Sequence, residues 1–339
     1  MNRYMIAAFA GLVSAGCAAA PALAADKIVV NQSAQSLSAA AIYIAEAKGF
    51  FEEQDLDVEF VATGSGIKSI VPLLNGQSQF CACIFSHQLD AVNAGAGEVK
   101  VIGTLMSGYA HQIVIGKDFA EEVGFDEEMS LEEKMQLLKG QNVGITSPNS
   151  STDQVMRFLM EMAGMNPDRD ATLIALGAEN LPAALANHQI SAFIMTPPVP
   201  ERSIMAGDAI PLVQLTEMDA PPLTTSIFMT IATSADYLED NRDVAVRLLK
   251  AVAAAETFLA ENPDEARKIL KEAQFNRMDQ ETFDIAFEGN QPLYAKSPEV
   301  TMESVEAGFE LARKFAREEL TVTPEVLVDT TVASEALGN

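Results

Sequence analysis

The sequence contains no tryptophan, three histidines and three cysteines among its 339 residues. Without tryptophan, the chain has no indole surface against which an aromatic ligand could stack. Cys17 lies in a leader-like segment, so only Cys81 and Cys83 belong to the rest of the chain. Side chains two residues apart on a strand point to the same side, where a disulfide would be strained. We therefore expect two buried thiols, because free cysteine is among the most buried residue types.

The histidines also lack the spacing of metal ligands, such as two histidines four residues apart on a helix. His87, His111 and His188 lie on three separate segments. Cys81, Cys83 and His87 could imitate a metal site, but structural zinc normally takes four protein ligands at recognisable spacing. The chain has no Gly-rich phosphate loop and no Gly-x-Ser-x-Gly nucleophile elbow. We therefore expect no metal, no cofactor and no catalytic residues, and hence a protein that is not an enzyme.

Basic residues are scarce: 22 Lys and Arg stand against 48 Asp and Glu, which gives a formal net charge of -26. An acidic surface of this size repels nucleic acid and anionic membranes and favours solubility. It also provides no long-range steering of anions. A chain of this length is typical of about two domains, and its 48% hydrophobic content can fill both cores.

Residues 1–25 are predicted to be a signal peptide. A positive start and an apolar stretch precede a small-x-small signal at residues 22–24, so cleavage is expected near Ala24, with a periplasmic product. Cys17 raises the alternative of a lipoprotein, but Ser14 stands where a lipobox has a branched apolar residue, so we expect soluble export. The apolar stretch is shorter than the roughly 20 residues that span a bilayer, and no later stretch resembles a transmembrane helix.

The chain that follows opens with a strand–helix–strand pattern. An apolar strand over residues 28–30 leads through a polar loop to an alanine-rich helix over residues 37–48, which Gly49 can end in the left-handed conformation. A strand of alternating polar and apolar residues follows over residues 57–61. Two strands joined in this way run parallel, and ligands of such sheets bind at the carboxyl ends of the strands.

Two stretches carry a resemblance to a known family. They read Ala-Ile-Tyr-Ile-Ala-Glu-Ala-Lys-Gly-Phe-Phe at residues 41–51 and Asp-Leu-Asp-Val at residues 55–58. They resemble the start of the nitrate/sulfonate/taurine-type solute-binding proteins of ABC importers, a family that also includes the pyrimidine-precursor synthases of thiamine biosynthesis. The resemblance implies a two-lobed α/β fold of the type II periplasmic binding protein class, with a ligand cleft between the lobes. We expect residues 26–112 plus 226–339 to form the first lobe and residues 113–225 the second, joined by two crossover strands.

A weak internal repeat supports two similar lobes. Residues 74–84 and 185–194 both read as a helix end, a tight turn and a buried strand. In the family each turn usually carries Gly and then Asp before the strand, and Gln79 and Ser191 replace that Asp here. The departures fall in structural turns, so they concern how closely the chain is related to the family rather than its fold.

Three local expectations concern the remaining elements. Pro72 is expected to bend the helix over residues 67–75 or to confine it to a turn or two. The buried strand over residues 80–85 is expected to end in a loop at residues 86–88. The helices that follow the second lobe are expected to pack as a buttress on the first lobe.

The candidate ligand-binding residues stand where predicted strands end, in the loop before a predicted helix over residues 153–163, or near the crossover strands. They are Gln35, Ser36, Ser65, Phe85, Ser86, Tyr109, His111, Asn149, Ser150, Ser151, Thr152 and Thr196. The loop at residues 149–152 places three hydroxyls at a helix N-terminus, which suits an acceptor or anionic group on a ligand. A plain N-cap is the alternative. Few cations lie in these loops, whereas a site for a highly charged anion usually contains Arg.

These features favour a periplasmic receptor that captures a small molecule by hinge closure and delivers it to an ABC permease and its ATPase. The ligand is expected to be a sulfonate, a nitrate-like anion, or a small N-heterocycle or aromatic compound. The receptor is expected to be a monomer that binds no nucleic acid. Two alternatives stay open: an enzyme similar to the pyrimidine-precursor synthases, and a periplasmic sensor module. The signal segment argues against the enzyme, because those synthases are intracellular.

Overall fold

The computed structural model describes residues 25–33, 35–64, 66–218, 220–315 and 319–338. The predicted signal peptide with its cleavage site near Ala24, Cys17 within it, and the candidate residue Ser65 lie outside the described residues. Across these ranges, no helix combines the length and the apolar character needed to cross a membrane.

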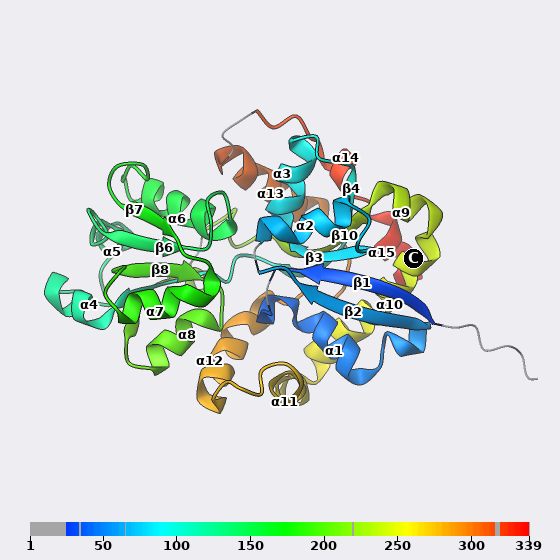
Figure 1. The fold of residues 1–339 in the computed structure, drawn as a ribbon, viewed down its shortest axis with the longest axis horizontal. Helices are drawn as coiled ribbons and strands as arrows, with labels where there is room; N and C mark the ends of the chain where they lie inside the picture. The colour runs from blue at the N-terminus through cyan, green and yellow to red at the C-terminus, as the bar shows by residue number, and fades with distance from the viewer. Residues whose placement is uncertain (1–24, 34, 65, 219, 316–318, 339) are drawn as a thin grey trace, which may run out of the picture.

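The first sheet consists of β1 (Asp26–Gln32), β2 (Leu56–Ala62), β3 (Phe80–Ile84), β4 (Val99–Ser107) and β10 (Ile227–Ser234). Its strand order is β2-β1-β3-β10-β4 (Figure 1). β2, β1 and β3 run parallel, whereas β10 is antiparallel to both of its neighbours. The predicted strand–helix–strand unit at the start of the chain is therefore confirmed.

The second sheet consists of β5 (Gln112–Gly116), β6 (Asn142–Ile145), β7 (Thr172–Ala175), β8 (Ala192–Met195) and β9 (Ala209–Gln214). Its strand order is β7-β6-β8-β5-β9, and β5 is antiparallel to both of its neighbours. Each sheet thus contains one strand that enters from the other half of the molecule and runs against its neighbours. Two mixed α/β sheets lying side by side give the two-lobed fold that the sequence predicts (Figure 1).

The chain crosses between the sheets twice, through residues 108–111 and again between β9 and β10. The two crossing segments are tied together, since the backbone N–H of Gly108 donates to the carbonyl of Ser226 at 2.8 Å. Gly108 has a φ of 82°, and an added Cβ would lie 2.9 Å from the carbonyl oxygen of Thr224, so glycine is required at this close approach. The exact lobe boundaries expected from the sequence stay a prediction.

The first predicted helix is α1 (Ala40–Lys48), preceded by a 3-10 turn at Leu37–Ala39. Gly49 ends it with a φ of 75°, as predicted. α2 (Gly66–Leu74) is nine residues long and contains Pro72, so the proline does not end the helix, and the expected bend stays a prediction. Pro72 lies near the C-terminal end of α2, so the missing N–H removes one late helix bond, while the Pro72 carbonyl accepts the N–H of Gln77 at 2.8 Å.

The loop expected after β3 is instead the first turn of α3 (Phe85–Asn93). Phe85 packs edge-on against Phe309, with 5.8 Å between the ring centroids. Leu89, four residues later, belongs to the same buried cluster. Apolar residues four apart share one face of a helix, so this packing favours a helical turn directly after Ile84. Ser86 therefore lies in a helix and not in a loop.

The second lobe carries five helices among its described residues: α4 (Lys117–Val123), α5 (Leu131–Gln136), α6 (Ser151–Met162), α7 (Leu181–Ala186) and α8 (Val199–Met205). The internal repeat is visible where α2 leads into β3 and α7 leads into β8. Gly76 in the first turn has a φ of 67°, and His188 in the second has a φ of 54°. Both turns thus use the left-handed backbone conformation, the second without glycine.

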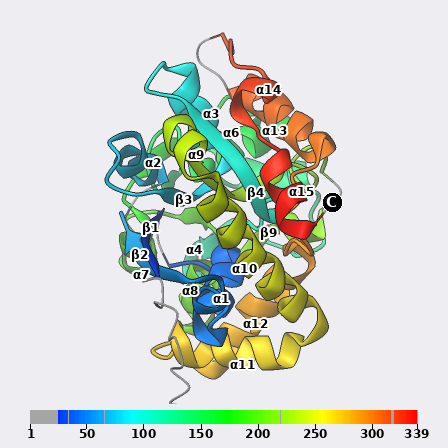
Figure 2. The ribbon, with the colours of Figure 1, turned by 90° about the vertical axis from the view of Figure 1, so that its right-hand side faces the viewer.

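The C-terminal helices are α9 (Ala235–Asp240), α10 (Arg242–Glu261), α11 (Pro263–Ala273), α12 (Gln280–Asn290), α13 (Met302–Phe315), α14 (Pro324–Leu327) and α15 (Thr331–Leu337). Figure 2 shows α10 between α1 and α15, the buttress on the first lobe that the sequence predicts. α12 and α13 do more, because α12 contacts α8 and α13 contacts α6 of the second lobe. The first lobe therefore touches the second through two separate helices.

The expectation of two free thiols is wrong. Cys81 and Cys83 lie on β3 with their Cα atoms 5.4 Å apart, and their sulfurs are joined as a disulfide. Both residues are buried. The pairing follows from the strand geometry, which turns side chains two residues apart toward the same face.

Candidate ligand-binding site

A cavity of about 90 Å³ lies between the two lobes. The first lobe lines it with residues that follow β1, begin α3 or open β10, chiefly Ser33, Gln35, Ser36, His87, Phe228 and Met229. The second lobe lines it with residues that follow β6 and β8, chiefly Thr146, Ser150, Ser151, Thr152, Met195 and Thr196. The cavity thus lies at the carboxyl ends of β1, β3, β6 and β8, the edge at which open α/β sheets hold ligands.

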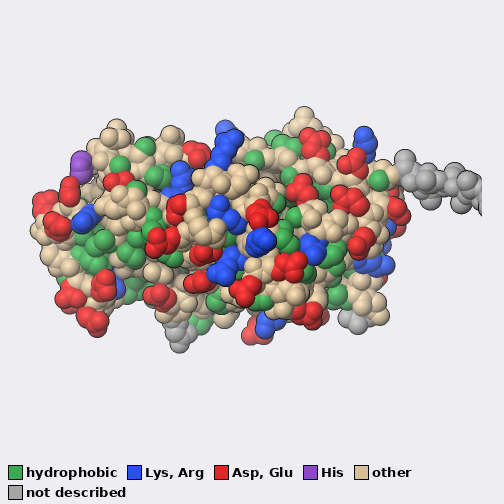
Figure 3. All heavy atoms as spheres, turned by 90° about the horizontal axis from the view of Figure 1, so that it is seen from below, with side chains coloured by type: hydrophobic (Ala, Val, Ile, Leu, Met, Phe, Trp, Pro, Cys, Tyr) green, Lys and Arg blue, Asp and Glu red, His purple; other side chains and the backbone are tan. Residues whose placement is uncertain are grey.

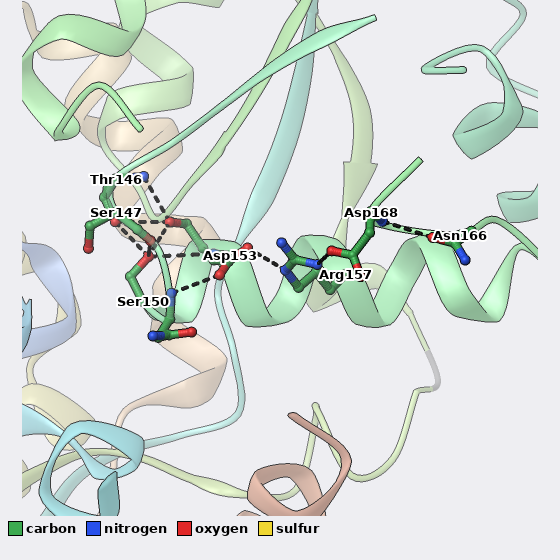
Figure 4. A network of polar contacts seen from close by, with 9 residues as sticks. Thr146, Ser147, Ser150, Asp153, Arg157, Asn166 and Asp168 are labelled. Carbon is green, nitrogen blue, oxygen red and sulfur yellow. Dashed lines mark hydrogen bonds and ion pairs between the residues drawn. The ribbon is translucent and has the colours of Figure 1, made fainter. Parts of the chain in front are cut away.

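The loop before α6 is organised by its own hydroxyl groups (Figure 4). Ser150 is the N-cap of α6 and accepts the backbone N–H of Asp153 at 3.4 Å. Its Oγ donates to the carbonyl of Ser147 at 2.7 Å and lies 2.9 Å from Oγ1 of Thr146 and 2.8 Å from Oγ1 of Thr152. Ser150 therefore holds the loop in shape, which matches the N-cap alternative, while it also lines the cavity.

Asn149, a candidate ligand-binding residue, does not line the cavity. It is exposed and has a φ of 62°. Its backbone N–H donates to Oδ2 of Asp153 at 2.7 Å. Oδ1 of Asp153 in turn accepts from Nε of Arg157 at 2.7 Å (Figure 4). Asn149 thus acts through its backbone in fixing the first turn of α6.

Ser151 connects the cavity wall to a crossing segment. Its Oγ lies 3.1 Å from Nε2 of His111, and both residues are buried. Burial lowers the pKa of His111 to about 3, so its ring is neutral at ordinary pH. Tyr109 and His111 do not line the cavity. They lie behind Phe228, with ring centroids 4.6 Å and 5.7 Å from that of Phe228.

On the first lobe, Gln35 and Ser36 both line the cavity. Ser36 caps the 3-10 turn before α1 by accepting the N–H of Ser38 at 3.2 Å. The amide of Gln35 donates to the backbone carbonyl of Gln274 at 2.7 Å, which turns it toward the cleft mouth. Gln35 accordingly also lines a larger outer pocket of about 850 Å³, where the exposed cations Arg202 and Arg277 stand.

Six main lining residues are not among the candidates from the sequence: Ser33, His87, Thr146, Met195, Phe228 and Met229. His87 is the one of these with an ionisable side chain. It lies in the first turn of α3, is 4% exposed and lines the cavity. Neither ring nitrogen has a hydrogen-bond partner among the described residues. Burial lowers its pKa to about 4, so the imidazole is neutral at ordinary pH. Its place directly after a buried strand was the available signal. The neighbouring Phe85 and Ser86 are not among the lining residues.

The charge of the inner cavity differs from that of its surroundings. Of the described residues that line it, none is Lys or Arg, and the one carboxylate, Glu179, is exposed at the mouth. Acidic side chains are spread over both lobes on the face seen in Figure 3. Within the described ranges, no group of three or more His, Cys, Asp or Glu side chains could hold a metal ion. The cavity can therefore recognise a ligand through hydroxyls, amides, an imidazole and apolar contacts.

The model of the NMT1-like family matches residues 34–273, more than half of the chain. The chain belongs to the NMT1-like family. A curated relative from Bacillus subtilis (strain 168), named "Putative binding protein YtlA", is 22% identical over 313 residues, which cover 88% of this chain and 87% of the relative.

Two solved structures show the same fold. The ligand-binding component of an ABC-type import system from Staphylococcus aureus superimposes with a TM-score of 0.72 at 13% identity, covering 91% of this chain and 98% of its own. The periplasmic nitrate-binding protein NrtA from Synechocystis PCC 6803 gives a TM-score of 0.69 at 17% identity, with 92% and 88% covered. The fold class expected from the sequence is therefore confirmed.

Proposed function

We propose that this protein is the solute-binding receptor of an ABC importer. It captures a small molecule between its lobes and delivers it to a membrane permease and its ATPase. The observation that carries the proposal is the cavity between the lobes, which residues of both lobes line at the carboxyl ends of their strands. The names of the structural relatives, a component of an ABC-type import system and a nitrate-binding protein, support the same role.

The proposed place of action is the periplasm. The leader predicted at residues 1–25 and the strongly acidic composition both fit an exported, freely diffusing receptor. A monomer suffices for this role, because one chain supplies both walls of the cavity. The candidate ligands are a sulfonate, a nitrate-like anion, or a small N-heterocycle or aromatic compound.

The alternative of an enzyme has one structural feature in its favour, the contact between Ser151 and His111. A serine hydroxyl beside an imidazole is the arrangement of a nucleophile and its base. The surroundings argue against that role. Burial lowers the pKa of His111 to about 3, which makes it a poor proton acceptor. Its other ring nitrogen, Nδ1, has no hydrogen-bond partner among the described residues, whereas a catalytic histidine is oriented by such a partner. We therefore propose binding without turnover.

The test is to identify the natural ligand and to follow it through binding. Mass spectrometry of the compound released by denaturing protein purified from its natural host identifies the ligand. That compound should raise the unfolding free energy by about 2.7 kcal/mol at a hundred times its dissociation constant and be recovered unchanged.

Closure is measured in the same samples. Glu121 on α4 and Glu272 on α11 are exposed positions on opposite lobes. Spin labels attached to the variants Glu121→Cys and Glu272→Cys should come closer together when ligand is added. Chemical conversion of the tightly bound compound would overturn the receptor proposal in favour of an enzyme. An unchanged label distance would overturn the closure mechanism.

A further inference from the structure

The side chain of His87 occupies an unusual position for a buried polar group. It lines the inner cavity, is 4% exposed, and leaves both ring nitrogens without a partner among the described residues. Buried polar groups in native proteins are nearly always hydrogen-bonded, so an unpaired pair of ring nitrogens at a cavity wall requires an explanation. A ligand in the cavity would supply the missing partner.

The imidazole that meets this ligand is uncharged. Burial lowers its pKa to about 4. A neutral imidazole offers one N–H donor and one acceptor nitrogen. It can therefore pair with a carbonyl or an N–H group, but it cannot compensate the charge of an anion.

No other lining residue supplies that compensation. Among the described residues of the cavity wall there is no Lys or Arg. The positive end of the α6 dipole is already matched by the carboxylate of Asp153 in its first turn, which is buried and paired with Arg157. Glu179 at the mouth adds a negative charge, while Arg202 and Arg277 line the outer pocket and not the inner wall. An anion enclosed here would lose its hydration without gaining a cation, which is costly.

The remaining walls fit an apolar body. Phe228, Met195 and Met229 line the same cavity, together with Pro197 and Pro198. The ring of Phe228 is held from behind by Tyr109, with 4.6 Å between the centroids. A flat or compact apolar group can pack on this surface while its polar edge faces His87 and the hydroxyls of the second lobe.

We propose that His87 is the specificity-determining residue of the cavity and that the ligand is an uncharged molecule, apolar in its body and carrying a carbonyl or N–H group of the amide or lactam type. This inference rests on the proposed receptor function and names its ligand class. It selects against the sulfonates and nitrate-like anions that the family resemblance also allows.

The experiment measures binding by titration calorimetry and by the melting temperature, with uracil and nicotinamide as uncharged probes and nitrate and methanesulfonate as anions. At least one uncharged probe should bind, and neither anion should bind more tightly. His87→Leu removes both ring nitrogens at similar size and should weaken the uncharged probe about 5- to 150-fold, the loss of one buried hydrogen bond. His87→Gln, which keeps a donor and an acceptor, should recover part of that loss. The melting temperature of His87→Leu without ligand should not fall.

His188→Asn is the matched control, because His188 is exposed, does not line the cavity, and has a positive φ that asparagine tolerates. It should bind the uncharged probe as the wild type does. Tighter binding of an anion, no binding of either uncharged probe, or equal binding by His87→Leu would each overturn the inference. If an anion binds, closes the lobes and is recovered chemically unchanged, the receptor proposal still holds and only the ligand class is wrong. Chemical conversion of a probe that still depends on His87 would overturn the receptor proposal instead.

Discussion

Nε2 of His111, on the first crossing segment, lies 3.1 Å from Oγ of Ser151 at the first turn of α6. The same imidazole meets the ring of Phe228 edge-on, at 5.7 Å between centroids and 82° between planes. Phe228 and Ser151 both line the cavity, from different lobes. His111 therefore links the two walls of the site to the segment that must move when the lobes open.

This pair should behave as one buried hydrogen bond. Ser151→Ala leaves the imidazole of His111 buried without its partner, so the free energy of unfolding should fall by about 1–3 kcal/mol. His111→Phe in the Ser151→Ala background removes both polar groups and should recover much of that loss. Urea unfolding of the two single variants and the double variant measures the coupling. Additive losses in the double variant would mean that the hydrogen bond does not stabilise the protein.

Ser150 should act mainly through folding, because it is the cap of α6. Ser150→Ala should lower the free energy of unfolding without ligand by about 1 kcal/mol, the usual cost of losing an N-cap. Ser147→Ala is the control, since Ser147 contributes its backbone carbonyl to the network and alanine keeps that group. Thermal and urea unfolding of the ligand-free proteins decide the matter. If Ser150→Ala is as stable as the wild type but binds the ligand more weakly, Ser150 contacts the ligand and does not stabilise the fold.

Glu201 should make stability depend on pH. It is 6% exposed on α8, Oε2 has no partner among the described residues, and burial raises its pKa to about 7. Because the folded protein holds this proton more tightly than the unfolded chain does, the stabilisation is complete below the unfolded pKa of about 4.3 and is lost as the pH rises through 7. Glu201→Gln should therefore be more stable than the wild type at pH 8, by roughly 3 kcal/mol, and similar to it at pH 4.

Urea unfolding at several pH values measures this difference, and Glu122→Gln at an exposed position of α4 serves as the control. The control variant should follow the wild-type pH profile. A Glu201→Gln profile parallel to that of the wild type would show that Glu201 does not titrate in this range.

Lys314 on α13 should favour the closed form. Its Nζ lies 5.3 Å from the ring centroid of Phe158 on α6, across the lobes. Cation–π contacts at exposed sites contribute about 0.5–1 kcal/mol, so Lys314→Gln should weaken ligand binding about 2- to 5-fold. The substitution also removes the ion pair with Glu310 one turn away, so ligand-free stability should fall by only about 0.3–0.5 kcal/mol. Lys134 lies over Phe125 within the second lobe, at 5.9 Å, and Lys134→Gln should leave affinity unchanged. If Lys314→Gln and Lys134→Gln bind the ligand with equal affinity, the contact between Lys314 and Phe158 does not favour the closed form.

Local patterns in the sequence determined the elements of the fold. The alternating residues of β2, the alanine-rich run of α1 and the left-handed end at Gly49 all depend on neighbours within about four residues, so they can be read without a structure. Thr196 was recognisable as a cavity candidate because it directly follows β8, and strand ends define the ligand edge of an α/β sheet. The hydroxyls at residues 150–152 were recognisable because they stand at the start of the helix that follows β6.

Tertiary packing decided the rest. Whether the residues after β3 form a loop or a helix depended on Phe85 meeting Phe309, more than two hundred positions away in the chain. That contact turned Phe85 away from the cavity and left His87 on its wall. Tyr109 and His111 likewise became the support behind Phe228, because β10 returns beside the first crossing segment. A histidine in a sequence shows its chemistry, but only long-range packing decides whether it is charged, buried or free to meet a ligand.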